Sequence, residues 1–208
     1  IDGTKEIATK FLESKKPNFP WKVHYLDQPG KSSAVNFALK SIKTEFFVMT
    51  DADSHCRKDS LSLLMDNMSN PEIGAVCGSF HVIDEGLEFQ YRKRFNALRI
   101  AESIRNSTPI FEGSICAFRI ESLGGQLIDE DVNADDSQLA MLSIKNGFKS
   151  IMDGRVQFTE PNSPMGRRRR VRRAQGLSRV LFRNRKLAFG RSPISGIMRQ
   201  NLYFYLVF

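Results

Sequence analysis

Two aspartates stand close together in the stretch FFVMTDADSHC, residues 46–56. Asp51 and Asp53 are separated by one small residue, so their carboxylates repel each other unless a cation lies between them. Mg²⁺ or Mn²⁺ binds at such places through one or two carboxylates and keeps other coordination positions for substrate phosphate oxygens. The alternative is a polar strand-to-helix turn in which Asp53 or Ser54 caps the helix. The spacing alone leaves both interpretations open.

A second candidate residue for chemistry is Lys31, in the stretch QPGKSSAVNFAL. It follows a Pro-Gly turn and opens an expected helix. The backbone N–H groups of a helix N-terminus and the lysine ammonium can both contact a phosphate group. The alternative is an ordinary solvated lysine after a turn.

The elements that must position these residues alternate between helices and strands. Apolar periodicity predicts helices over residues 4–14, 31–42, 58–69, 88–104 and 135–147, the last ended by Gly147. Compact or alternating apolar runs predict strands over residues 22–27, 45–50, 73–82, 113–120 and 149–160. We expect an α/β fold with a mostly parallel sheet, and residues 45–50 to be a strand buried on both faces. Ligands bind beyond the carboxyl ends of strands in such sheets, where Asp51 and Asp53 fall.

Charge is divided unevenly along the chain. From Pro161 onward there are 12 Lys and Arg residues and no Asp or Glu, whereas the preceding 160 residues hold 19 basic and 23 acidic residues. This asymmetry predicts a phosphate-rich partner, either a nucleic acid or an anionic membrane. The three cysteines lack the spacing of a disulfide framework or a metal site. A hydrophobic content of 41% is sufficient for a packed core.

Seven stretches, taken together and in order, resemble the family-2 glycosyltransferases, which have the GT-A fold. They are GKSSAVNFAL, MTDADS, PEIGAVCGSF, FEGSICAFR, the Gly124-Gly125 pair, ADDSQLAMLSIKNGF and RRVRRAQGL. The resemblance implies a GT-A nucleotide-diphospho-sugar transferase fold, with a mostly parallel mixed sheet flanked by helices. It implies inverting transfer of a sugar from a nucleotide-sugar donor, UDP-linked by default, to a hydroxyl of a glycan or lipid-linked acceptor.

The resemblance also implies roles for individual residues. The donor would be bound by Lys31, Asp51, Asp53 and Arg172, and the metal, Mg²⁺ or Mn²⁺, would be held by Asp53 and Asp51. The floor of the acceptor site would be formed by Glu112, Gly113 and Ser114. The catalytic residues would be Asp136 and Asp135. Asp136 would be the general base, and Asp135 replaces the glutamate that is usual before it.

Asp136 suits a base because it begins a predicted helix and its side chain is free to point into a cleft. A helix N-terminus favours the ionised carboxylate, so we expect the pKa of Asp136 not to be raised. The alternative is that Asp135 or Asp136 is merely the N-cap of this helix.

The resemblance divides the chain into a catalytic domain, residues 1–160, and a segment of residues 161–208. The family normally begins with further strands, so the first strands are expected to be missing and the chain alone to have little activity. The second segment would contain an Arg-rich active-site loop, a membrane-interface helix with apolar residues between residues 177 and 189, and the start of a transmembrane segment. We therefore expect a membrane-associated enzyme with a cytoplasmic catalytic domain.

Two alternative functions stay open at this point. One is transfer to a polyprenyl phosphate, which needs no base because the acceptor is already ionised. The other is a nucleic-acid-binding module that uses the Arg-rich tail. Against nucleic acid as a partner, the tail has few aromatic residues on which bases would stack.

Overall fold

The computed structural model describes residues 3–27, 29–81, 87–160 and 167–207 of the chain. Its helices are α1 (Thr4–Lys15), α2 (Lys31–Ser41), α3 (Ser60–Met68), α4 (Leu87–Arg105), α5 (Asp135–Lys145), α6 (Arg167–Arg183) and α7 (Pro193–Val207), with 3₁₀ turns η1 (Ile120–Leu123) and η2 (Arg185–Phe189). Its strands are β1 (Phe46–Thr50), β2 (His55–Cys56), β3 (Ile73–Phe80), β4 (Ile115–Arg119) and β5 (Lys149–Thr159). The alternation of helices and strands confirms the predicted α/β class.

The five strands form one mixed sheet in the order β1-β4-β3-β5-β2. Only the pair β3–β5 is parallel among the described strands, and the other three pairs are antiparallel. The expected majority of parallel pairs is therefore wrong. The reason is that β4 enters between β1 and β3 in the opposite direction, and strand direction cannot be read from apolar periodicity.

This reversed strand has a direct consequence for the candidate residues. Thr50 at the end of β1 pairs with Ile115 at the start of β4, and the Asp51 N–H donates to the Ser114 carbonyl oxygen at 3.4 Å. The segment before β4 therefore lies beside the aspartates that follow β1. Two stretches that are more than sixty residues apart in the sequence meet at one edge of the sheet.

The prediction of a strand buried on both faces applies to β3 and not to β1. Every residue of β3 is buried, because this strand lies at the centre of the sheet. β1 lies at the edge of the described sheet, and its residues are half-buried or exposed. The predicted strand over residues 22–27 is also wrong, since this stretch has no regular secondary structure.

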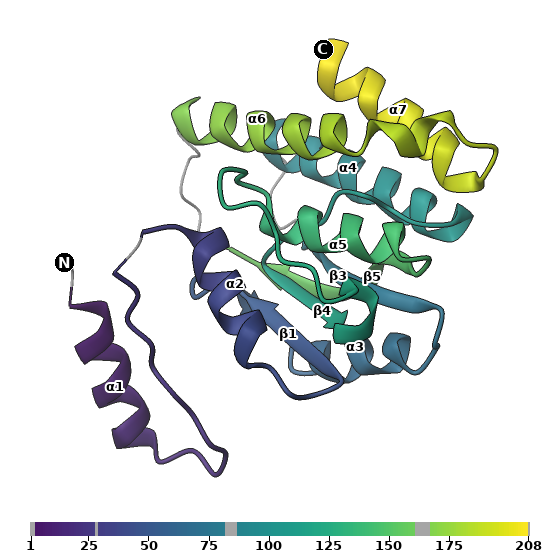
Figure 1. Ribbon diagram of the computed structural model, residues 1–208. Helices are drawn as coiled ribbons and strands as arrows, with labels where there is room; N and C mark the ends of the chain where they lie inside the picture. The colour runs from purple at the N-terminus through teal and green to yellow at the C-terminus, as the bar shows by residue number, and fades with distance from the viewer. Residues whose placement is uncertain (1–2, 28, 82–86, 161–166, 208) are drawn as a thin grey trace.

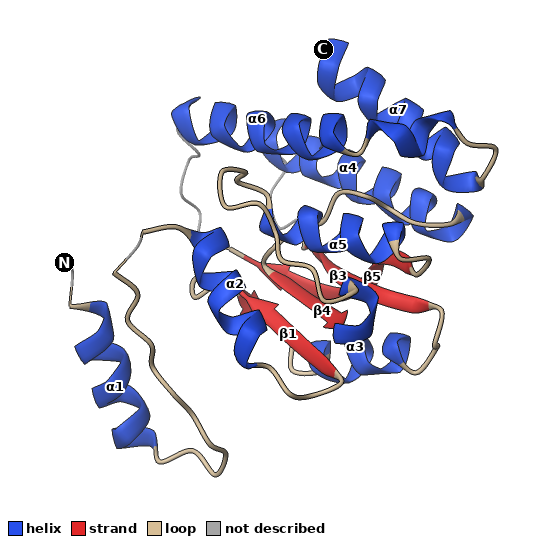
Figure 2. Ribbon diagram, in the orientation of Figure 1, coloured by secondary structure: helices blue, strands red, loops and turns tan. Residues whose placement is uncertain are grey.

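Helices lie on both faces of the sheet (Figure 2), and apolar side chains pack between these helices and the strands. On one face, β3 and β4 pack against α5 through Cys77, Phe118 and Leu139. On the other face, they pack against α3 through Leu64 and Val76. Figure 1 shows α1 standing apart from these layers, and α1 has no buried residue.

The C-terminal helices pack onto the rest of the protein. Val180 and Leu181 of α6 and Met198 of α7 join Ile110 and Met141 in a third cluster of buried apolar residues. Figure 1 shows α6 and α7, in green to yellow, above α5 and beside α4.

The Arg-rich stretch is thus a helix from residue 167 onward, and residues 161–166 lie outside the described part of the chain. Several apolar residues expected to face lipid are instead in contact with protein. Val180 and Leu181 are buried, and Leu177 and Leu187 pack against the same cluster. Phe189 is the exception, because its side chain is 83% exposed. None of the described helices is both long and apolar enough to cross a membrane.

Candidate active site

A cleft of about 1030 Å³ opens between the end of the sheet, the start of α5 and helices α4 and α6. Eight of the nine residues predicted from the sequence line it: Lys31, Asp51, Asp53, Glu112, Gly113, Asp135, Asp136 and Arg172. Only Ser114 is not part of the lining. Cleft volumes of roughly 300–1,000 Å³ hold one drug-sized ligand, so this cleft has room for a donor and part of an acceptor.

Lys31 connects the two acidic pairs. Its Nζ lies 2.7 Å from Asp51 Oδ1 and 3.3 Å from Asp135 Oδ2. Burial by itself lowers the pKa of Lys31, but the hydrogen bond to Asp51 and the charges of the nearby aspartates outweigh burial and raise it above its usual value. Lys31 is therefore a fixed positive charge at the mouth of the cleft, where it begins α2.

Asp136 is largely enclosed, with part of its side chain reaching the cleft. Burial, followed by the charge of Asp135, raises its pKa to about 7, although the Ser137 N–H and Lys31 act in the opposite direction. The expectation of an unraised pKa is wrong because loss of hydration and the neighbouring carboxylate outweigh the helix N-terminus. The capping alternative is also not observed, since Ala134 is the N-cap and no side chain caps α5.

Asp51 and Asp53 suit a shared divalent cation. Asp53 is exposed to the cleft and makes no hydrogen bond or ion pair with any residue that the structure describes. Asp51 Oδ1 accepts a hydrogen bond from Lys31, and its second carboxylate oxygen is available for a cation. No group of three or more His, Cys, Asp or Glu side chains in the described part of the chain could hold a metal by itself. Two carboxylates fit Mg²⁺ or Mn²⁺ when phosphate oxygens complete the coordination.

Gly113 lies directly against Asp136. A Cβ atom at Gly113 would stand 2.9 Å from Asp136 Oδ2, so a larger residue here would displace the carboxylate. Its two neighbours are held by charged side chains. Glu112 pairs with Arg92 at 3.4 Å, and Ser114 donates to Glu160 at 2.6 Å. Ser114 therefore supports the cleft floor without facing the cleft.

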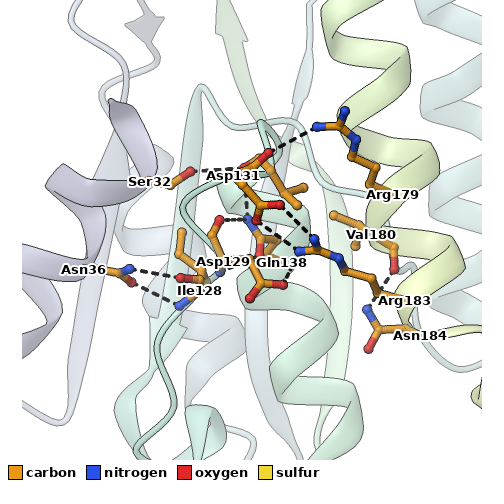
Figure 3. A network of polar contacts seen from close by, with 11 residues as sticks. Ser32, Asn36, Ile128, Asp129, Asp131, Gln138, Arg179, Val180, Arg183 and Asn184 are labelled. Carbon is orange, nitrogen blue, oxygen red and sulfur yellow. Dashed lines mark hydrogen bonds and ion pairs between the residues drawn. The ribbon is translucent and has the colours of Figure 1, made fainter. Parts of the chain in front are cut away.

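The loop of residues 128–133, which leads into α5, is held by two helices that carry candidate residues (Figure 3). From α2, Asn36 exchanges two hydrogen bonds with the backbone of Ile128, at 2.9 and 3.0 Å. From α5, Gln138 accepts from the Asp129 N–H and donates to its carbonyl oxygen. The loop thus fixes Lys31 and Asp136, which begin these two helices, relative to each other.

Helix α6 contacts the same loop. Arg183 lies 2.6 Å from a carboxylate oxygen of Asp129 and 2.8 Å from one of Asp131 (Figure 3). These hydrogen bonds to Asp131 and Asp129 raise the pKa of Arg183. A Cβ atom at Gly176 would stand 1.8 Å from the carbonyl oxygen of Asn133, so only glycine permits this approach. Arg172 lies one turn before Gly176 and reaches the cleft because the helix docks here.

Several lining residues were not found by sequence reasoning: Tyr91, Arg92, Phe95, Arg99, Asn133 and Tyr205. Four of these lie on α4, a helix whose apolar and charged residues resemble those of any amphipathic helix. Tyr205 lies on α7 and reaches the cleft only through the packing of the C-terminal helices. No sequence pattern around Gly176 indicated its close contact with the loop of residues 128–133.

A pair of aspartates at the end of β1, a second pair at the start of α5 and arginines across the cleft define, on this mixed sheet, an α/β protein of the GT-A type. The family model described as "Glycosyl transferase family 2" matches residues 1–124. The chain therefore belongs to this family, which confirms the predicted family and fold.

Solved structures agree with this assignment. The mannosyltransferase PcManGT from Pyrobaculum calidifontis, in complex with GDP-Man and Mn²⁺, is 30% identical with a TM-score of 0.83, over 98% of this chain and 57% of that chain. TarS from S. aureus shares the fold at 16% identity with a TM-score of 0.61, over 99% of this chain and 35% of that one. The chain thus spans little more than half of the first of these proteins and about a third of the second. No curated protein sequence is significantly similar to the chain.

Proposed function

We propose that the chain is the catalytic part of an inverting glycosyltransferase, which moves a sugar from a nucleoside-diphosphate donor to an acceptor hydroxyl. The observation that carries this proposal is the cleft itself. It brings Asp51, Asp53 and Lys31 from the strand-end side, Asp136 from α5 and Arg172 from α6 around one space. These side chains suit a diphosphate, a divalent cation and a hydroxyl group that gives its proton to Asp136.

In this proposal, Asp53 and the free oxygen of Asp51 hold Mg²⁺ or Mn²⁺ against the donor diphosphate. The bound ion neutralises the charge that builds on the departing nucleoside diphosphate. Lys31 stands beside Asp51 and offers its ammonium to the same phosphates. From the opposite wall, Arg172 offers planar guanidinium donors that suit phosphate oxygens.

Asp136 is the proposed general base. Its carboxylate takes the proton of the acceptor hydroxyl while the hydroxyl attacks the anomeric carbon from the side opposite the diphosphate, which inverts the configuration. A pKa of about 7 lies near the operating pH, where a base is most effective. Gly113 gives the acceptor close access, because it has no side chain beside the carboxylate.

The donor nucleotide is still to be decided between uridine diphosphate and guanosine diphosphate. The sequence led us to expect UDP, whereas the relative that is 30% identical is described with GDP-Man. We propose to measure nucleotide binding and donor hydrolysis with GDP-mannose, UDP-glucose and UDP-N-acetylglucosamine, each with and without Mn²⁺. We expect binding of one nucleotide class to depend on Mn²⁺ and to be lost in Asp53→Ala.

Asp59→Ala is a matched control, because Asp59 is an exposed aspartate outside the cleft that pairs with Arg57. This variant should bind like the wild type. Full Mn²⁺-dependent binding and hydrolysis in Asp53→Ala would remove the metal role and with it the proposed function.

We also propose that the enzyme works at the cytoplasmic face of a membrane. The support is the exposed surface of α6 and η2, where Phe182 and Phe189 are 52% and 83% exposed and Arg185 and Lys186 lie beside them. Aromatic and basic side chains together suit an anionic membrane interface. Sedimentation with vesicles of phosphatidylcholine with and without phosphatidylglycerol tests this. We expect binding only to the anionic vesicles, and weaker binding after Phe189→Ser.

A further inference from the structure

The helical end of the cleft contains an arginine whose charge is not matched by a carboxylate. Arg99 of α4 is 4% exposed and lines the cleft. Its Nη1 donates to the Ile110 carbonyl oxygen at 3.2 Å and its Nη2 to the Tyr205 hydroxyl at 3.1 Å. Its Nε has no hydrogen-bond partner among the described residues. All of its protein partners are neutral groups.

The nearest acidic side chains are engaged elsewhere. Glu102 accepts from Thr108 and from Asn201, each at 2.7 Å. Glu112 forms its ion pair with Arg92. Burial lowers the pKa of Arg99, but Tyr205 and the charges of Glu112 and Glu102 outweigh burial and raise it, so the guanidinium stays charged without touching a carboxylate. An anion bound in the cleft would give this buried charge a direct ion pair.

Rings surround this arginine. Tyr91 and Phe95 lie with their ring centroids 4.4 Å apart, and the Arg99 guanidinium lies 5.4 Å from the centre of the Phe95 ring. Tyr205 and Leu177 line the same part of the cleft. Aromatic faces of this kind pack against apolar or ring-shaped ligands. The subsite therefore combines a buried cation with a wall of aromatic rings, in which Tyr91 and Phe95 are tilted by 42° to each other.

The subsite is connected to the proposed base by one short segment. Arg99 binds the carbonyl oxygen of Ile110, and Gly113 lies against Asp136. Three residues of extended chain span at most about 10 Å. The Phe111 N–H donates to Ser137 Oγ at 3.1 Å, which fixes this segment to α5. A ligand of one or two sugar rings can therefore contact Arg99 and Asp136 at once.

We propose that this end of the cleft binds the acceptor, and that the acceptor is a sugar carrying an anionic group, either a phosphate or a carboxylate, which pairs with Arg99. The inference rests on the proposed sugar transfer and adds the class of acceptor. The ring of the acceptor packs on Tyr91, Phe95 and Tyr205, and its nucleophilic hydroxyl lies at Asp136. Arg99 thereby distinguishes charged acceptors from neutral ones.

The test compares three ligands that share one ring: methyl glucoside, methyl glucoside 6-phosphate and methyl glucuronide. Their dissociation constants are measured by calorimetry with the wild-type chain, Arg99→Gln, Arg99→Lys, Tyr205→Phe and Arg191→Gln. Tyr205→Phe removes the hydroxyl that Arg99 contacts but keeps the charge. Arg191→Gln removes an equal charge outside the cleft.

We expect the wild type to bind at least one anionic probe about tenfold more tightly than the neutral one. Arg99→Gln should abolish this difference, Arg99→Lys should keep part of it, and Arg191→Gln should retain it. Tyr205→Phe leaves Arg99 charged, so it should keep more of the difference than Arg99→Gln does. The better anionic probe identifies phosphate or carboxylate as the preferred group. Equal binding of the neutral and anionic probes, or an unchanged preference in Arg99→Gln, would overturn the proposal.

A nucleotide measurement separates this inference from the proposed function. GDP and UDP binding with Mn²⁺ should be the same in Arg99→Gln as in the wild type. If Arg99→Gln weakens nucleotide binding as much as probe binding, Arg99 serves the donor and the inference is wrong. If the wild type binds neither GDP nor UDP, the proposed function is wrong, whatever the three sugar probes show.

Discussion

The two walls of the cleft carry opposite charges and are built in different ways. The strand-end wall holds Asp51, Asp53, Asp135 and Asp136, with Lys31 between the two pairs. The helical wall holds five arginines, Arg92 and Arg99 on α4 and Arg170, Arg172 and Arg173 on α6. A diphosphate can be bound directly by the helical wall, but the acidic wall requires a cation to accept it. The proposed donor site therefore requires two walls that meet only when α6 is docked.

The walls also differ in how their charges are balanced. On the acidic wall, one lysine is shared by Asp51 and Asp135, and Asp136 is left with a raised pKa. On the helical wall, Arg99 contacts only neutral groups, and Arg172 is exposed. Each wall therefore carries an excess of its own charge toward the cleft. The raised pKa of Asp136 indicates that the ionised carboxylate is destabilised on the acidic wall, where the cleft opens.

Among substitutions that remove a charge from one wall, we expect the largest effect from Asp136→Asn, on the rate of sugar transfer. Asp136→Asn keeps the size of the side chain but cannot accept a proton, so transfer should fall by about 10²–10⁴-fold. Donor and Mn²⁺ binding should stay close to the wild-type values, because the base does not contact the diphosphate in the proposed arrangement. Steady-state transfer rates and nucleotide titrations check this.

The same variant distinguishes two kinds of acceptor. An acceptor whose nucleophile is a phosphate is already ionised and needs no base. Substantial turnover of Asp136→Asn with a polyprenyl phosphate would therefore contradict the role of Asp136 and favour the phosphate as nucleophile.

The stability of Asp136→Asn should change in the opposite direction from its activity. The folded pKa of about 7 lies above the usual value of 3.8, so the folded state binds more protons between these values. The wild type should lose stability as the pH rises from about 4 to 7, because Asp136 then ionises while buried and beside Asp135, and the Ser137 N–H and Lys31 compensate only in part. At pH 8, without nucleotide or metal, Asp136→Asn should be more stable by up to about 4 kcal/mol.

Urea unfolding of the wild type and Asp136→Asn at pH 4.5 and pH 8 measures this. The two proteins should differ less at the lower pH. An Asp136→Asn protein that is less stable than the wild type at pH 8 would show that the carboxylate is not under the strain that the geometry indicates.

The junction between the walls is tested at Gly176. A Cβ atom there would overlap the carbonyl oxygen of Asn133, so Gly176→Ala must shift α6 or the loop before α5. We expect a loss of stability of about 1–3 kcal/mol. Nucleotide binding should also weaken, because Arg172 moves with the helix.

Gly196→Ala on α7 is the matched control, since the nearest atom to its new Cβ would be 3.9 Å away. This substitution should cost little or slightly stabilise the helix. Equal behaviour of the two alanine variants would show that α6 does not need its close approach to the loop.

The acidic wall could be predicted from the sequence because its residues follow local signals. Asp51 and Asp53 come directly after an apolar run, and Asp135 and Asp136 begin a clear helical pattern. That these two pairs meet was implied by the family resemblance, and the structure brings them together through the reversed strand β4. The strand direction itself was not predicted, because periodicity shows which faces are buried and not how strands are ordered.

The helical wall was mostly missed, because its residues acquire their place only by tertiary packing. Arg99 looks like any charged residue of a long helix, and Tyr205 lies in a segment that we expected to enter a membrane. The pKa of Asp136 was predicted in the wrong direction for the same reason. A helix N-terminus is visible in the sequence, whereas burial and the distance to Asp135 are not.

The smallest effect is expected at Arg183, where α6 is tied to the loop from outside the cleft. Arg183→Gln removes the ion pairs to Asp129 and Asp131, but all three groups are solvated, and such pairs contribute little. We expect nucleotide binding to weaken by less than about fivefold, and more at low salt than at high salt, because screening already weakens the pair. Arg185→Gln is the control, because Arg185 is exposed, pairs with no carboxylate in the described part of the chain, and contacts the carbonyl oxygen and the ring of Phe182. A loss as large as that of Gly176→Ala would mean that charge, and not the close backbone approach at Gly176, holds the two walls together.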